Sequence, residues 1–146
     1  MALAPGLLSF VQIVVADTDT AVALGSGDVP VLGTPRLLAL AEAAAVAAIG
    51  PSLESGVTSV GTSAVLEHKR PSPVGAEVVV EAELAEVDGP RLGFRFIARQ
   101  KRAAGSPDGE GPDGEDPEVE DIVIGAGTLE RVLVDRDQFI RRARRR

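Results

Sequence analysis

The 146-residue sequence contains no cysteine, tryptophan or tyrosine, and it has only four phenylalanines and one histidine. Without cysteine there is no disulfide, no thiolate nucleophile and no cysteine-ligated zinc site. Nothing in this composition requires an oxidising compartment, so we expect a cytoplasmic protein. Aromatic residues make up 3% of the chain and hydrophobic residues 45%, which means that aliphatic side chains must fill most of the core.

The sequence also lacks a long hydrophobic run. No stretch approaches the roughly 18 consecutive apolar residues that a membrane helix requires. The apolar start has no basic segment before it and is interrupted by Ser9 and Gln12, which argues against a secretion signal. We therefore predict no membrane contact and a single domain over residues 1–146, a length that suits one core.

The net charge of −7 comes from one segment. Eight acids and no base lie between residues 106 and 121, namely Asp108, Glu110, Asp113, Glu115, Asp116, Glu118, Glu120 and Asp121. Removing them leaves −7 + 8 = +1, so the rest of the chain is almost neutral. Gly, Pro and acid predict a flexible insert at about 103–120. Its spacing does not fit a calcium loop, and we predict no metal and no cofactor.

Basic residues are concentrated in the last six residues of the sequence, RRARRR. Such a basic tail is most often a solvated helix end, so it does not by itself predict nucleic acid as a partner. The segment RDQFIRRARRR is predicted to close the chain as a short helix.

One long helix is predicted within TPRLLALAEAAAVAAIGPS, residues 34–52. Thr34 is a candidate N-cap, Pro35 suits the first helical position, and Gly50 and Pro51 end the run. The middle of this helix is apolar on nearly all sides except at Glu42, as expected for a helix enclosed by other elements.

The remaining segments have strand-like patterns. They are SFVQIVV, TSVGTSAVLEH, AEVVVEAELAEV, RLGFRFIARQ and DIVIGAGTLERVLV. Asp88-Gly89-Pro90 marks a hairpin turn between two of them. One enclosed helix and long strands joined by short turns predict an α+β protein with a curved antiparallel sheet wrapped around the helix.

Three residues then carry a family resemblance: Thr34 in GTPRLLALAE, Glu42 eight residues later, and His68 in VLEHKRPSPVG, a further 26 residues on. With these spacings, the stretch resembles the fluoroacetyl-CoA thioesterase-like family of hotdog-fold enzymes. The resemblance implies a Thr-Glu-His catalytic set, with Gly61 of SVGTSAVLEH beside the acyl group. GAGTLER is similar to the final strand of the family.

The chemistry of these residues supports the resemblance. An ionised Glu42 on an apolar helix needs compensation, and either an imidazole or an arginine is a suitable partner. A pair of Glu42 and His68 could activate water at neutral pH, or Glu42 could attack the thioester directly and form an anhydride. Eight helical residues span about 12 Å, too far for a direct Thr34–Glu42 hydrogen bond. Either the approach to the helix curls back, or the two residues grip different substrate atoms.

The resemblance implies hydrolysis of an acyl-CoA thioester by a homodimer with clefts shared between subunits, in which His68 could face the helix of the other subunit. The phosphates of CoA would need cations, and the candidates are Lys69, Arg70, Arg91 and Arg131. The segment GDVPVLG stands where the fluoroacetyl-CoA enzyme has aromatic residues over its acyl pocket. We therefore expect a short- or medium-chain acyl group. The alternatives are a non-catalytic acyl-CoA-binding module and, less favoured, a hotdog dehydratase or hydratase.

Overall fold

The structure, a computed structural model, describes residues 3–102 and 121–145. The predicted acidic insert at about 103–120 lies outside these residues, so its flexibility stays a prediction. Within the described ranges, no helix is long and apolar enough to cross a membrane. The main elements are β1 (Leu8–Val14), α1 (Ala21–Leu24), α2 (Thr34–Ile49), β2 (Val57–His68), β3 (Glu77–Asp88), β4 (Arg91–Gln100), β5 (Ile122–Asp135) and α3 (Arg136–Arg144).

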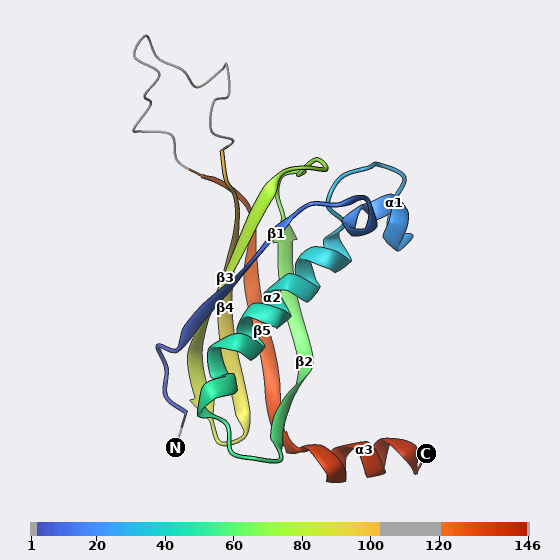
Figure 1. Ribbon diagram of the computed structural model, residues 1–146. Helices are drawn as coiled ribbons and strands as arrows, with labels where there is room; N and C mark the ends of the chain where they lie inside the picture. Colours follow the sequence, from blue (N-terminus) through green and yellow to red (C-terminus); the bar gives the residue numbers. More distant parts are fainter. Residues whose placement is uncertain (1–2, 103–120, 146) are drawn as a thin grey trace.

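The five strands form one antiparallel sheet in the order β1-β3-β4-β5-β2. The sheet curves around α2, which lies along one face (Figure 1). The predicted hairpin turn joins β3 to β4, and Gly89 there has a φ of 59°, a conformation that glycine adopts without strain. This arrangement confirms the α+β prediction of one long helix wrapped by an antiparallel sheet.

The core lies between α2 and the inner face of the sheet. Strand β3 buries every second residue, and its inward set is Val78, Val80, Ala82 and Leu84. Helix α2 meets this surface mainly with alanine and leucine. Among the described residues, the buried aromatic side chains are Phe94 and Phe96, so the prediction of an aliphatic core is confirmed.

The start of α2 differs from the prediction by one residue. Gly33 is the N-cap, and Thr34 is the first helical residue with no capping hydrogen bond from its side chain. The predicted cap at Thr34 was therefore wrong, because the preceding glycine takes the extended capping conformation. The Thr34 hydroxyl is left free to point elsewhere.

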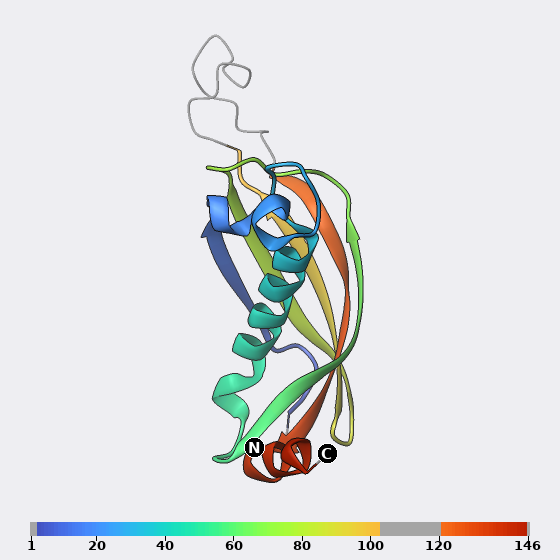
Figure 2. The same cartoon turned by 90° about the vertical axis from the view of Figure 1, so that its right-hand side faces the viewer.

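Residues 15–33 form a short cover at the N-terminal end of α2 that the sequence patterns did not predict. It contains a 3-10 turn η1 (Asp17–Asp19) and α1. Its end is bonded to the loop after β2, since the Leu32 amide donates to the Ser72 carbonyl at 2.8 Å. The cover thereby lies over the end of the molecule where β2 finishes (Figures 1 and 2).

Strand β2 is one edge of the sheet, and its middle is exposed from Gly61 to Val65. The predicted closing helix, α3, begins directly after β5 at the opposite end of the molecule from the cover. It projects past the β2 edge, away from β1 (Figure 1), and is seen nearly end-on when that edge faces the viewer (Figure 2).

Candidate active site

The end of β2 and the start of α2 bring Thr34 and His68 together. The Thr34 Oγ1 and the His68 Nδ1 are 2.8 Å apart and share a hydrogen bond. Thr34 is the first residue of α2 and His68 is the last residue of β2. Two of the three residues that carry the family resemblance therefore meet within one chain.

These two residues line a pocket of about 250 Å³. Its other walls come from the cover, through Ala21 and Val31, and from Lys69 and Arg70 after β2. The pocket thus joins a hydroxyl, an imidazole and two cationic side chains. Such a combination suits an anionic substrate that carries a polar reacting group.

The second ring nitrogen of His68, Nε2, is buried and has no hydrogen-bond partner among the described residues. Burial lowers the pKa of His68 below its ordinary value of 6.5, and the backbone of Arg70 acts in the opposite direction. The imidazole is therefore neutral at physiological pH, which is the state that a general base needs.

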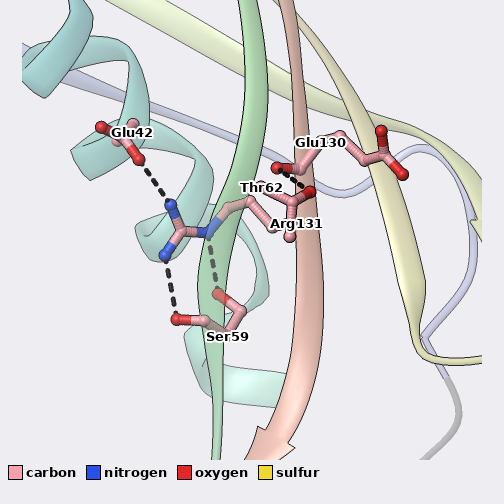
Figure 3. Close-up of polar contacts among 5 residues, drawn as sticks. All are labelled: Glu42, Ser59, Thr62, Glu130 and Arg131. Carbon is pink, nitrogen blue, oxygen red and sulfur yellow. Dashed lines mark hydrogen bonds and ion pairs between the residues drawn. The ribbon is translucent and has the colours of Figure 1, made fainter. Parts of the chain in front are cut away.

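Glu42 lies two turns further along α2 and pairs with Arg131 of β5 (Figure 3). The Glu42 Oε2 accepts a hydrogen bond from the Arg131 NH1 at 3.0 Å. The Arg131 Nε donates to the Ser59 Oγ at 2.8 Å, and NH2 donates to the Ser59 carbonyl at 2.9 Å. The arginine side chain is 8% exposed, whereas that of Glu42 is 41% exposed, so the carboxylate faces outward on an enclosed guanidinium.

Gly61 leaves room beside this pair. A Cβ at position 61 would lie 2.7 Å from the Glu42 Oε2 and 3.4 Å from the Arg131 NH1. Any larger residue would push the carboxylate away from its position. Gly61 therefore lies directly beside the Glu42 carboxylate, and its predicted place beside the acyl group stays a prediction.

The described contacts do not bring Glu42 to His68 within one chain. Glu42 takes the arginine partner that the sequence left open, and Thr34 does not contact Glu42. Since both lie on one continuous helix, the approach to the helix does not curl back, and the two residues hold separate positions. Ser59, which anchors Arg131, was missed because nothing in its strand pattern distinguishes it from other inward-facing residues.

The four predicted cations fall in different places. Lys69 and Arg70 line the Thr34–His68 pocket. Arg91 lies at the start of β4, beside the end of β5 that leads to α3. Arg131 is enclosed by Glu42 and Ser59, so little of its guanidinium is open to a phosphate.

A second ion pair fixes the cover to α2. The Arg36 Nε donates to the Asp19 Oδ1 at 2.7 Å, and the Ala16 amide donates to the Asp19 Oδ2 at 2.8 Å. The Gly33 amide donates to the Asp19 carbonyl at 2.9 Å. Burial raises the pKa of Asp19, but the Ala16 hydrogen bond and Arg36 outweigh it and leave the pKa below 3.8. The pair of Asp19 and Arg36 therefore attaches the cover, which forms one wall of the pocket, to the first turn of α2.

Comparison with solved structures identifies the class of protein. The chain is similar to a hot-dog-like protein from Thermanaerovibrio acidaminovorans, with a TM-score of 0.75, 21% identity, and 95% and 89% of the two chains covered. It is also similar to a mutant of the fluoroacetyl-CoA-specific thioesterase solved with fluoroacetate and CoA, with a TM-score of 0.73, 30% identity, and 94% and 99% covered. The chain is a hotdog-fold thioesterase.

The family follows from sequence. A family model described as fluoroacetyl-CoA-specific thioesterase matches residues 15–104. The fluoroacetyl-CoA thioesterase of Streptantibioticus cattleyicolor is 34% identical over 116 residues, which cover 80% of this chain and 70% of that protein. The chain belongs to the fluoroacetyl-CoA-specific thioesterase family, so the predicted resemblance, fold and enzyme class are confirmed.

Proposed function

We propose that the chain hydrolyses a short- or medium-chain acyl-CoA thioester to the carboxylic acid and CoA. One observation carries the proposal: the hydrogen bond of Thr34 to His68 in a pocket where the His68 Nε2 is buried without a partner. A buried, unpaired imidazole nitrogen is costly unless a ligand or water completes it. The substrate named for the Streptantibioticus relative, fluoroacetyl-CoA, is a short acyl thioester.

In the proposed mechanism, His68 donates its Nδ1–H to the Thr34 hydroxyl oxygen, which fixes the tautomer that leaves the Nε2 lone pair free. The Nε2 accepts a proton from water as the water oxygen attacks the thioester carbonyl carbon. The carbon–sulfur bond then breaks, and CoA leaves with the proton from His68. In this mechanism the Thr34 hydroxyl and the positive end of α2 would stabilise the developing oxyanion.

Glu42 has two possible roles in this scheme. It either orients the attacking water and the histidine, or attacks the carbonyl itself to form an anhydride that water cleaves. Single turnover in ¹⁸O-labelled water tests these roles when the enzyme is digested and Glu42 is weighed by mass spectrometry. Label in the Glu42 carboxylate shows an anhydride that water cleaves at the Glu42 carbonyl carbon. Label confined to the product acid excludes that cleavage, and trapping with hydroxylamine then separates an anhydride cleaved at the acyl carbon, which leaves a hydroxamate on Glu42, from direct attack by water, which leaves none.

We further propose a homodimer in which two β2 edges pair. The β2 edge presents unpaired backbone groups, and residues 61–67, all exposed except the half-buried Leu66, include only one charge, Glu67. Pairing about a two-fold axis is antiparallel, so the His68 end of one strand approaches the Gly61 region of the other. In such a dimer, His68 of the partner subunit would approach Glu42, which unites the three residues that one chain keeps apart.

Lys69 and Arg70 are the proposed contacts for the CoA phosphates, because they line the pocket. For Arg131 we replace the phosphate role with that of holding the Glu42 carboxylate, since its donors are already engaged. Arg91 lies at the end of the sheet opposite the pocket. It remains a candidate phosphate contact only if that end of the sheet contributes to the cleft of the partner subunit. The cytoplasm remains the predicted location.

The test is a panel of acyl-CoA esters of increasing chain length, with release of the CoA thiol followed by a chromogenic reagent. We expect turnover to fall once the acyl chain exceeds the length that the pocket admits. The variant His68→Ala should lose turnover but still bind CoA. Binding of the esters without turnover by the unaltered enzyme would contradict hydrolysis and indicate a binding module.

A further inference from the structure

Helix α3 carries a cationic face with no assigned role. Arg141, Arg142 and Arg145 follow Gln138 at helical spacing and line one hollow of about 220 Å³. All three arginines are exposed, and across residues 3–102 and 121–145 none of them forms an ion pair. Three neighbouring guanidinium groups repel one another, so an anion with several charges would stabilise them.

This arginine face and the pocket lie at opposite ends of one chain. The Arg136 amide is bonded to the Gly56 carbonyl, just before β2 begins, and His68 is where β2 ends. Twelve extended residues span roughly 40 Å, and a nine-residue helix reaches only about 13 Å. The face therefore does not reach the cleft of its own chain.

Antiparallel pairing of two β2 edges brings the arginine face of one chain to the pocket end of the other chain. The start of β2 in one chain then lies beside the end of β2 in the other. Helix α3 begins beside the start of β2 and extends past the edge of its own sheet (Figures 1 and 2), which is the direction of the paired subunit. Pairing through the β1 edge would instead leave α3 on the far side.

We propose that Arg141, Arg142 and Arg145 bind the phosphate groups of the CoA held in the partner subunit's cleft. The inference rests on the proposed hydrolysis of acyl-CoA. Guanidinium groups bind phosphate oxygens in bidentate fashion, and CoA carries a diphosphate and a 3′-phosphate. Among the residues that the structure describes, Lys69 and Arg70 are the cations that line the pocket itself. The helix would supply the additional positive charge in trans.

The first experiment compares two substrates with the same acyl group, the CoA ester and the N-acetylcysteamine ester, which lacks the phosphates. The triple variant R141A/R142A/R145A should lose roughly tenfold or more of the preference in kcat/KM for the CoA ester, because its contacts with the charged phosphates are removed. The control is Arg95→Ala, an exposed arginine on β4, which should leave the preference unchanged. An unchanged preference in the triple variant would overturn the proposal.

The second experiment uses mixed dimers of differently tagged chains. One chain carries His68→Ala with an intact α3, and the other carries intact His68 with the triple substitution. The only working cleft is then served by the intact helix of its partner, so the preference for the CoA ester should be normal. If it is normal only when His68 and the intact α3 share a chain, the arginines act within their own subunit and the proposal is wrong.

Failure of the proposed function has a different signature. If the unaltered enzyme hydrolyses neither ester, the hydrolase mechanism fails, and calorimetric titration with CoA and with pantetheine decides the inference. Weaker binding of CoA but not of pantetheine to the triple variant supports an arginine–phosphate site. Equal binding of CoA to both proteins overturns it.

Discussion

The two ion pairs of α2, each with one buried partner, are built in opposite ways. In the pair of Asp19 and Arg36 the carboxylate is enclosed, with a side-chain exposure of 12%, and the arginine is 34% exposed. In the pair of Glu42 and Arg131 the arginine is enclosed at 8% and the carboxylate is 41% exposed. The enclosed partner is in each case the one held by additional hydrogen bonds, to the Ala16 amide and to Ser59 respectively.

This inversion indicates different roles. An enclosed carboxylate with all its bonds made within the protein can tie segments together but cannot meet a substrate. An open carboxylate on an enclosed guanidinium is held in place and remains available to react. We therefore assign Asp19 to the architecture of the cover, and we propose Glu42, with Thr34 and His68, for the chemistry.

The largest expected effect comes from the imidazole itself. His68→Ala should lower kcat by roughly 10²- to 10⁴-fold, the usual contribution of a general base. The melting temperature should change little, because the ring is lost from the margin of a pocket. Steady-state kinetics and thermal unfolding on the same preparation check this. A folded variant with unaltered kcat would exclude His68 from catalysis.

Glu42→Gln should also reduce kcat strongly, while Asp19→Asn should leave most of it. The glutamine keeps the shape but removes the charge that orients water or attacks the carbonyl. If Glu42 and His68 serve one step, the double variant should be scarcely slower than the slower single variant. Losses that multiply would show that the two residues act in separate steps.

The fold could be predicted to a large extent because its signals are local. Residues 34–49 consist of strong helix formers followed by Gly-Pro, and strands such as β3 alternate buried and open residues. The cover at residues 15–33 was missed because α1 has only four residues. So short a helix has no periodic pattern. The cover is instead held in place by contacts with residues outside it, Arg36 and Ser72.

The site was predictable only in part. Family spacing pointed to Thr34, Glu42 and His68, while the chemistry left the partner of Glu42 open between an imidazole and an arginine. Within one chain that partner is Arg131. These partners are 89 residues apart. Arg131 lies opposite Gly61 in the β2–β5 ladder, directly before a shift of the register between Gly61 and Ser63. A bulge changes which residues face inward, and composition gives no sign of it.

A smaller effect, on stability, should separate the architectural pair from surface charge. Asp19→Asn weakens bonds to Arg36 and Ala16, and a buried hydrogen-bond defect costs about 1–3 kcal/mol. Glu83→Gln is the matched control, because Glu83 and Arg95 are 3.8 Å apart with side chains 44% and 68% exposed, and solvent-exposed pairs contribute about 0–1 kcal/mol. Urea unfolding should show a clear loss for the first variant and almost none for the second. Equal losses would contradict the architectural assignment.

The smallest effects are pH dependences, which should differ between the two sites. The pKa of His68 is lowered, so the neutral base persists below pH 6.5 and the acid limb of kcat/KM should have its midpoint under that value.

The pKa of Asp19 is lowered from 3.8, so its stabilising contribution is present above that pH and is lost as the pH falls through the folded-state pKa. The stability difference between the unaltered enzyme and Asp19→Asn should therefore be constant near neutrality and shrink below about pH 4. Unfolding in urea across pH 3 to 7 measures that difference, and a pH–rate profile of the unaltered enzyme measures the histidine. An acid limb above pH 6.5 would mean that a charged neighbour, such as the proposed Glu42 from the partner subunit, stabilises the imidazolium more than burial opposes it.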